Sequence, residues 1–582
     1  MTELFYEKYP TQARVVRMAF LSAFVMLGIG ALFGLIQALH RTDVFRFIDS
    51  PTYYTVLTAH GVFLVIAFTI FFLVGLYQWA VTDSLERGPV DQRVTWGWLG
   101  LMSVGTLITA ISILAGFLDE PPEVLGSELS ADVLFTFYAP LQANPLFYIG
   151  LVLFVVGTWI AGADWFRTWF AWKRENPGER IPLPTFMVLT TMLMWYLSSI
   201  GVAIAILAFL LPWSVGIVES VNPTLTRTLF WYFGHPVVYF WLLPAYLLWY
   251  IVLPHVSGGR LFSDPLARVV FILFVILSVP TGIHHQYLDP GIAEGFKYIV
   301  MVNTMFILLP SLLTAFTVVA SIEHGARQRG GTGTFDWLRA LPWKEPAFTG
   351  MALAGLVFAF GGFTGIVNAG MNINYLVHNS LWVPAHIHTQ VGTAVALTFM
   401  AGSYWLVPQL VGNRLRFRGL ALVQVVLWFV GIVVMTNSMY RGGLIGQPRR
   451  TAEPQYDFDY EIGVGTVGEL DAQVALGGTL LFVSAVLFLG IMLATLLNRD
   501  QDPLVTGRIQ PALSGPEDSP QVLDNLKLWV GIAIVLVVLA YLLPLASIVS
   551  RGGLFGPDIG PFFPVSIEAV ELLVATLTAS VG

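Results

Sequence analysis

The stretch WYFGHPVVYF, residues 231–240, sets an imidazole and a phenol one helical turn apart inside an apolar segment that covers residues 227–253. This segment is longer than the roughly 20 apolar residues that a helix needs to cross a bilayer. An ionisable side chain at membrane depth costs roughly 2.5 kcal/mol or more, so it persists mainly where it has a function. His235 and Tyr239 are therefore the first candidates for a functional site inside a membrane helix.

The whole chain has the composition of a polytopic membrane protein. Of its 582 residues 56% are hydrophobic and 11% are charged, whereas soluble domains carry about 25% charged residues. Segments of span length predict an all-α bundle of about 13 transmembrane helices. The predicted spans are 18–39, 55–80, 95–117, 146–168, 184–211, 227–253, 268–287, 298–321, 348–370, 381–410, 418–438, 472–497 and 527–549. The shorter segment 562–580, which carries two glutamates, is predicted to be an interfacial helix.

We expect one domain over residues 1–582, with the core motifs in 55–450 and extra helices and a tail in 470–582. Most of the 29 Lys and Arg residues fall in loops on the same side as the N-terminus. The positive-inside rule therefore predicts a cytoplasmic N-terminus. The N-terminus is not expected to be a cleavable signal, because Glu3, Glu7, Lys8, Arg14 and Arg17 precede an apolar run too long for an h-region. Nothing in the sequence suggests a nucleic acid partner.

Six of the ten histidines lie in or at the edge of predicted spans, and the predicted orientation brings all six to the outer part of the membrane. They are His60, His235, His284, His285, His386 and His388. A lone histidine there is often only a hydrogen-bonded interhelical contact, but six at one level indicate a metal and heme centre. The chain has no cysteine, which excludes iron–sulfur clusters, thiolate copper sites and covalently attached c-type heme within it.

Helical geometry divides these histidines into groups. His386 and His388 are two residues apart and therefore face different neighbours, so one helix can serve two centres. His284 and His285 can converge with His235 on one metal, for which copper is the expected ion in an intramembrane redox site. His60 can then pair with one histidine of the 381–410 span on a six-coordinate, low-spin heme.

Other polar residues extend this candidate site. Tyr239 lies one turn after His235 and could supply a proton and an electron to the metal. A hydroxyl path from the cytoplasmic side is predicted to comprise Tyr246, Tyr250, Ser311, Thr314 and Thr317. Ser and Thr in a span more often bond to their own helix carbonyls, which is the alternative interpretation. Arg449 and Arg450 are candidates for heme propionate contacts, the alternative being a solvated turn after Pro448.

Taken together, the motifs in 231–240, His284-His285 and His386-Ile387-His388 resemble subunit I of the heme–copper oxidases over nearly the whole chain. The resemblance implies that His60 and His388 ligate a low-spin heme, expected to be b-type, and that His386 ligates a high-spin heme of a- or o-type. It also implies that His235, His284 and His285 hold the copper ion called CuB. Tyr239 is implied to be covalently joined to His235.

The sequence also indicates the subclass, and it departs from the family pattern at two positions. Val237 stands where the commonest A-class members have a glutamate, and the residues around 382–384 resemble the B class, which uses one proton pathway. Ile387 stands where members usually have phenylalanine between the two heme ligands. Asn374 stands where a B-class member has aspartate near the propionates, which leaves His378 as the better candidate for proton loading there.

We therefore expect the catalytic subunit of a respiratory terminal oxidase that reduces dioxygen to water, takes up protons and pumps them. The expected partners are a subunit II that carries a copper electron-entry centre, an external donor such as cytochrome c or a blue copper protein, dioxygen and membrane lipid. The expected location is the plasma membrane of a bacterium or archaeon. The alternatives are a nitric oxide reductase subunit, which Tyr239 argues against, and a polytopic transporter with structural histidines.

Overall fold

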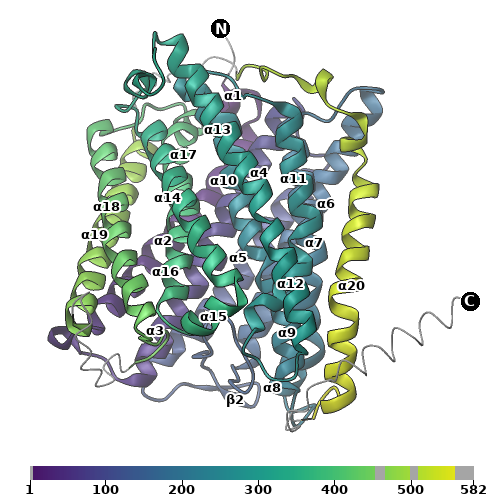
Figure 1. Ribbon diagram of the computed structural model, residues 1–582, viewed down its shortest axis with the longest axis vertical. Helices are drawn as coiled ribbons and strands as arrows, with labels where there is room; N and C mark the ends of the chain where they lie inside the picture. The colour runs from purple at the N-terminus through teal and green to yellow at the C-terminus, as the bar shows by residue number, and fades with distance from the viewer. Residues whose placement is uncertain (1–3, 453–465, 499–508, 557–582) are drawn as a thin grey trace, which may run out of the picture.

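The computed structural model describes residues 4–452, 466–498 and 509–556. Within these ranges twelve helices are long and apolar enough to cross a membrane, and a bent helix pair makes a thirteenth candidate. The predicted all-α bundle is confirmed (Figure 1). The predicted interfacial helix 562–580 lies outside the described residues.

The first half of the bundle contains the elements up to the stretch that carries His235. In chain order these are α1 (Phe5–Lys8), α2 (Pro10–His40), η1 (Asp43–Phe45), α3 (Ser50–Gly61), η2 (Val62–Phe68), α4 (Thr69–Ser84), α5 (Gln92–Leu114), η3 (Ala115–Phe117), β1 (Glu123–Val124), β2 (Ser127–Glu128), α6 (Pro145–Glu175), α7 (Leu183–Ile204), η4 (Ala205–Leu210), α8 (Leu211–Ser214), α9 (Pro223–Gly234) and α10 (Pro236–Ser257). The two short strands form an antiparallel hairpin in the loop after η3.

The second half completes the bundle around α10. Its elements are α11 (Asp264–Leu277), η5 (Val279–Gln286), α12 (Glu294–Phe306), α13 (Leu308–Gln328), η6 (Asp336–Ala340), α14 (Pro346–Ala369), α15 (Met371–Val377), α16 (Trp382–Thr389), η7 (Gln390–Val395), α17 (Ala396–Val411), α18 (Arg418–Leu444), α19 (Val467–Leu496), η8 (Pro516–Asp518), η9 (Gln521–Asp524) and α20 (Leu526–Gly552). The span Pro223–Ser257 is 94% buried, which makes α9 and α10 the centre of the described bundle.

Local sequence explains where the helices begin, end and break. Side-chain oxygens cap helix N-termini at Asp49, Asp91, Asn144, Asn222, Ser263 and Thr466. Pro236 has no amide hydrogen, and α9 gives way to α10 directly before it, so His235 lies at the junction. Gly258 ends α10 with a φ of 82°, a conformation that glycine adopts without strain.

The predicted span 268–287 is not one straight helix. It consists of α11 and the short 3-10 helix η5, and the two are bent by 54°. Pro280 and Gly282 lie in the second part, and both residues disfavour a continuing α-helix. The bend leaves His284 and His285 on η5, close to the α9–α10 junction, since η5 packs against α9.

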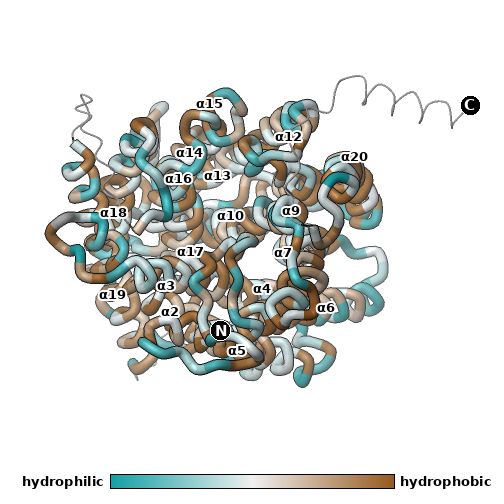
Figure 2. Tube along the Cα trace, turned by 90° about the horizontal axis from the view of Figure 1, so that it is seen from below, coloured by the Kyte–Doolittle hydropathy of each residue, from teal (hydrophilic) through white to brown (hydrophobic). Residues whose placement is uncertain are grey.

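Helix geometry is also irregular beside two other histidines. The π-helical segment η2 follows His60 directly after Gly61, and the π-helical segment η7 follows His388 after Thr389. Segments of π-helix are rare and occur frequently at functional sites. The outward faces of perimeter helices such as α18 and α20 carry hydrophobic residues (Figure 2), as expected for surfaces that contact lipid.

Candidate metal and cofactor site

A large cavity of about 490 Å³ lies inside the bundle, and all six candidate histidines line it. Its walls also include Tyr239, Ser311, His378, Arg449 and Arg450. The structure therefore brings these histidines together around one cavity. Most of the remaining lining residues are apolar, as in pockets that hold a large planar cofactor and orient it by a few polar groups.

Three histidines form a compact cluster at one part of this cavity. One ring nitrogen from each of His235, His284 and His285 lies within 4.8 Å of the other two. The Nδ1 atom of His235 is 3.1 Å from the Nε2 atom of His285. Ligands about 2.0–2.1 Å from one tetrahedral metal lie roughly 3.3 Å apart. The donor set and spacing fit a copper ion held by three imidazoles.

Neighbouring groups fix the rings of this cluster. The Nδ1 atom of His284 is 3.0 Å from Thr304 Oγ1, whose own hydrogen goes to the carbonyl of Val300 at 2.7 Å. Thr304 must therefore accept a hydrogen bond from Nδ1, which leaves Nε2 of His284 free for a metal. The indole of Trp231 stacks on His285, with ring centroids 3.8 Å apart and planes 7° apart.

Tyr239 completes the cluster on its other side. Its hydroxyl group is 2.9 Å from Nε2 of His235, the ring nitrogen that faces away from His285. The phenol is buried and packs against Phe274, with ring centroids 5.0 Å apart. The i to i+4 relation predicted from the sequence is thus realised as a direct contact, even though His235 lies at a helix junction.

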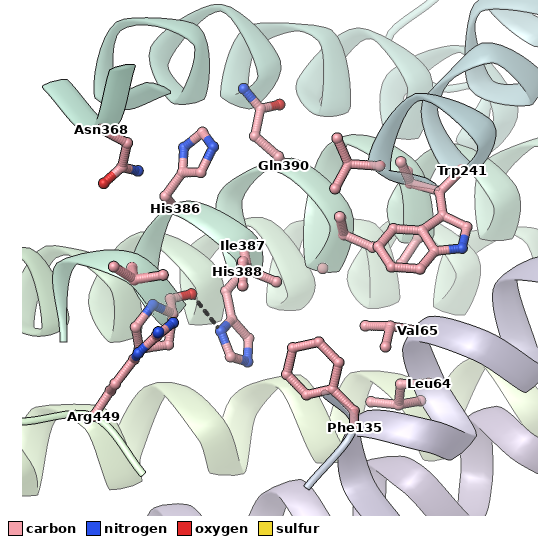
Figure 3. A pocket seen from close by; sticks show the side chains of 18 of the residues that line it. Leu64, Val65, Phe135, Trp241, Asn368, His386, Ile387, His388, Gln390 and Arg449 are labelled. Atoms are coloured by element: carbon pink, nitrogen blue, oxygen red, sulfur yellow. Dashed lines mark hydrogen bonds between the residues drawn. The ribbon is translucent and has the colours of Figure 1, made fainter. Parts of the chain in front are cut away.

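The two histidines of α16 point in opposite directions, as their spacing predicts, with Ile387 between them (Figure 3). The rings of His388 and His60 are stacked with centroids 6.1 Å apart and planes 18° apart. Their Nδ1 atoms lie 2.7 Å from the carbonyl of Pro384 and 2.9 Å from that of Gly30. Each Nδ1 therefore carries the proton, so each Nε2 is available to ligate iron.

The backbone beside these rings leaves room for a large cofactor. A methyl group added at Gly34 would come within 2.7 Å of the His60 ring, and one added at Gly365 would come within 3.1 Å of the His386 ring. Glycine at these positions lets the helices approach the histidines closely. The paired rings, the glycines and the apolar walls fit heme groups.

Two guanidinium groups line the cavity near the loop that follows α18. Arg449 donates to Oδ1 of Asn379 at 2.8 Å, and Arg450 donates to Oγ1 of Thr136 at 3.2 Å. Burial lowers the pKa of Arg449 to about 9, and the charge of Arg450 acts in the same direction. Burial likewise lowers the pKa of His378 to about 4, with Arg449 contributing. Two half-buried cations side by side fit anionic groups such as carboxylates of a cofactor.

The predicted hydroxyl path is only partly connected. Tyr250 and Thr314 are joined by a 2.7 Å hydrogen bond, and Tyr246 donates to Ser311 at 3.4 Å. The hydroxyl of Thr317 donates to the carbonyl of Leu313 in its own helix at 2.7 Å. Among the described residues no hydrogen bond joins Thr317 to the other four, so the alternative interpretation holds for its hydroxyl.

Sequence reasoning missed the hydroxyl groups that hold the histidine rings. Thr304 holds His284, and Thr364 lies 3.0 Å from Nδ1 of His386. A threonine in an apolar span gives no signal of this role, because its partner lies on another helix. His378 contacts Asn374, with Nδ1 and Oδ1 3.0 Å apart, a pair that the i to i+4 spacing could have suggested.

Comparison with known proteins agrees with this geometry. The family model described as cytochrome c and quinol oxidase polypeptide I matches residues 14–480. Cytochrome c oxidase subunit 1 of Thermus thermophilus is 41% identical over 553 residues, which cover 92% of this chain and 94% of the relative. Quinol oxidase subunit 1 of Bacillus subtilis is 26% identical over 74% of this chain and 65% of the relative.

A solved structure extends the likeness to the fold. A heme–copper terminal oxidase dimer determined by cryo-electron microscopy has a TM-score of 0.86 and 35% sequence identity. The alignment covers 98% of this chain and 99% of that chain. The chain therefore belongs to the cytochrome c and quinol oxidase polypeptide I family, and it is the catalytic subunit of a respiratory heme–copper terminal oxidase.

Proposed function

We propose that this subunit reduces dioxygen to water with His235, His284 and His285 as ligands of CuB. His386 is the ligand of an adjacent high-spin heme, and His60 with His388 holds a low-spin heme. The observation that carries the proposal is the contact of Tyr239 with His235, 2.9 Å from hydroxyl to Nε2, beside a three-imidazole cluster. A nitric oxide reductase or a transporter with structural histidines has no need for this tyrosine.

Individual residues of the chain have separate roles in the reaction. The bound heme iron and copper supply the redox chemistry that splits dioxygen. Nδ1 of His235 faces the copper cluster while its Nε2 faces the phenol, so Tyr239 can release a proton beside the metal without competing for it. Tryptophan stacking at His285 and the Thr304 contact at His284 hold the remaining rings in the productive orientation.

Protons for the reaction come from the cytoplasmic side along Tyr250, Thr314, Ser311 and Tyr246 to Tyr239. The contacts of 2.7 Å between Tyr250 and Thr314 and of 3.4 Å between Tyr246 and Ser311 support two links of this path. Thr317 is part of the predicted set; in the structure its hydroxyl donates to the Leu313 carbonyl, so its place on the path requires that hydroxyl to rotate. Proton pumping accompanies the reaction.

The outer end of the cavity binds the heme carboxylates. Arg449 and Arg450 are the propionate ligands, and His378 is the nearby group that accepts a pumped proton. The position of two half-buried guanidinium groups on the cavity wall supports this assignment, because a carboxylate beside them compensates two adjacent positive charges.

The low-spin heme is b-type and the high-spin heme is a- or o-type. A subunit II that carries a copper centre delivers electrons from cytochrome c or a blue copper protein, which suits a chain without cysteine of its own. The N-terminus is cytoplasmic, residues 1–582 form one domain, and the complex resides in the plasma membrane of a bacterium or archaeon.

The deciding experiment is a reduced-minus-oxidised spectrum of the purified protein with metal analysis. Low-spin and high-spin heme bands are expected, with one copper per two hemes in this subunit and additional copper where subunit II is present. Absence of heme bands would refute the oxidase assignment of these histidines. Iron in place of copper would favour the nitric oxide reductase alternative. Extraction of the hemes and their chromatography identifies their types, and turnover with reduced cytochrome c, blue copper protein or quinol identifies the donor.

A further inference from the structure

Behind His386 the structure contains three hydroxyl groups from three different helices. Thr364 of α14 places Oγ1 3.0 Å from Nδ1 of His386. Tyr440 of α18 donates its hydroxyl hydrogen to the same oxygen at 2.9 Å. Thr389 of α16 lies 3.0 Å from the Tyr440 hydroxyl and 2.8 Å from the backbone carbonyl of His386. We call Thr364, Tyr440 and Thr389 the hydroxyl triad.

Counting hydrogens fixes the protonation of the imidazole. A threonine hydroxyl has one hydrogen and two lone pairs. The hydrogen of Thr364 goes to the carbonyl of Gly361 at 2.8 Å. Its oxygen must therefore accept from both Tyr440 and Nδ1 of His386. His386 carries its proton on Nδ1, and its Nε2 is the atom available to iron.

The triad is held rigidly. The Tyr440 side chain is buried, and its ring packs edge-on against Trp382 with centroids 4.6 Å apart. Thr364 and Thr389 are also buried, with 5% and 2% of their surface exposed. The contacts begin at the imidazole of His386 and return to its own backbone carbonyl, so they tie α14, α16 and α18 to one side chain.

Resting on the proposed role of His386 as the high-spin heme ligand, we propose that the hydroxyl triad positions this imidazole and sets the strength of its bond to iron. A hydrogen bond accepted from Nδ1 makes the imidazole more basic and strengthens its metal bond. Tyr440 donates to the same oxygen and thereby makes it a weaker acceptor for the hydrogen on Nδ1. Thr364 strengthens the iron–imidazole bond and Tyr440 moderates it.

His60 and His388 provide an internal contrast. Their Nδ1 atoms face backbone carbonyls, those of Gly30 and Pro384. A carbonyl in that position cannot be removed by changing its side chain. Of these three, His386 is the one whose Nδ1 also faces a side-chain hydroxyl, that of Thr364, beside the backbone carbonyl of Gly361. The triad therefore allows the high-spin centre to be adjusted without changing the low-spin centre.

The test uses the intact enzyme and the variants Thr364→Val and Tyr440→Phe. The readouts are the iron–imidazole stretching frequency of the reduced high-spin heme by resonance Raman spectroscopy and the midpoint potential of each heme by spectroelectrochemistry. Thr364→Val should lower the frequency and raise the high-spin potential. Tyr440→Phe should shift both in the opposite direction. Thr436→Val is the matched control, since Thr436 is a buried threonine of α18 that donates to the carbonyl of Ile432.

Opposite shifts in the two variants, with the low-spin heme and the control unchanged, support the proposal. Unchanged frequencies, or shifts in the same direction in both variants, overturn it. A general loosening of packing would shift the frequency in the same direction in both variants. If Thr364→Val loses the high-spin heme, Thr364→Ser decides: retention of heme with the parental frequency supports the hydroxyl role, and loss overturns it. Absence of a high-spin heme from the parent protein would instead overturn the proposed function.

Discussion

Replacing Thr304 by valine tests whether a single hydroxyl holds the copper cluster in place. Valine keeps the shape of threonine and removes the oxygen that lies 3.0 Å from Nδ1 of His284. The buried Nδ1 proton then loses this acceptor, which costs about 1–3 kcal/mol. Loss of a hydrogen bond that orients a metal ligand typically weakens metal affinity about 10- to 100-fold, or about 1.4–2.8 kcal/mol at 1.4 kcal/mol per factor of ten. The two estimates of the free-energy cost agree.

The assay is copper retention. Parent and variant enzyme are incubated with a copper chelator, and the copper-to-iron ratio is followed by mass spectrometry, with the heme spectrum recorded in parallel. Thr304→Val should lose copper about 10- to 100-fold more readily while both hemes remain. Thr281→Val is the control, because Thr281 lies on the same η5 segment and its hydroxyl donates to the carbonyl of Ser278. Parental copper retention in Thr304→Val would refute the reasoning.

Three further changes probe the proton path, the chemistry and the stability of the bundle. Tyr239→Phe should abolish dioxygen turnover while the reduced-minus-oxidised spectrum retains both hemes, and full activity in this variant would contradict its assigned role. Tyr250→Phe removes the 2.7 Å contact with Thr314 and should slow steady-state turnover and proton uptake without altering either heme spectrum; an unchanged rate would remove Tyr250 from the path. Arg268→Met breaks a buried ion pair and should destabilise the protein by about 3–5 kcal/mol, whereas Arg327→Met, in an exposed pair, should cost about 1 kcal/mol or less in a thermal unfolding assay.

Much of the fold follows from the apolar segments, because span length and hydropathy are properties of each segment alone. The bend between α11 and η5 was not predicted, although Pro280 and Gly282 are visible in the sequence. Both residues also occur within continuous membrane helices, where neighbouring groups compensate for the lost backbone contacts. Whether the chain bends at them depends on the packing of η5 against α9 and α12.

The same distinction between features of one segment and features of tertiary packing applies to the candidate site. The grouping of the histidines could be predicted because it rests on spacing within a helix, as for His386 and His388. The partners Thr304, Thr364 and Tyr440 could not, since each meets its histidine across a helix interface that only the tertiary structure defines. The role of Thr317 stays a prediction: its regular spacing from Ser311 and Thr314 indicates a path, while in the structure its hydroxyl bonds within its own helix.

The ring nitrogens explain why one histidine of the six is different. In the proposed assignment, His60, His386, His388 and His284 each keep a proton on Nδ1, which faces an oxygen acceptor, and offer Nε2 to a metal. His235 is reversed, since its Nδ1 faces the cluster and its Nε2 faces the phenol. With Nδ1 directed at the cluster, Nε2 is the nitrogen that contacts the Tyr239 hydroxyl. The position of His235 at the α9–α10 junction, imposed by Pro236, therefore matters to the chemistry, because it sets which nitrogen the tyrosine one turn later can reach.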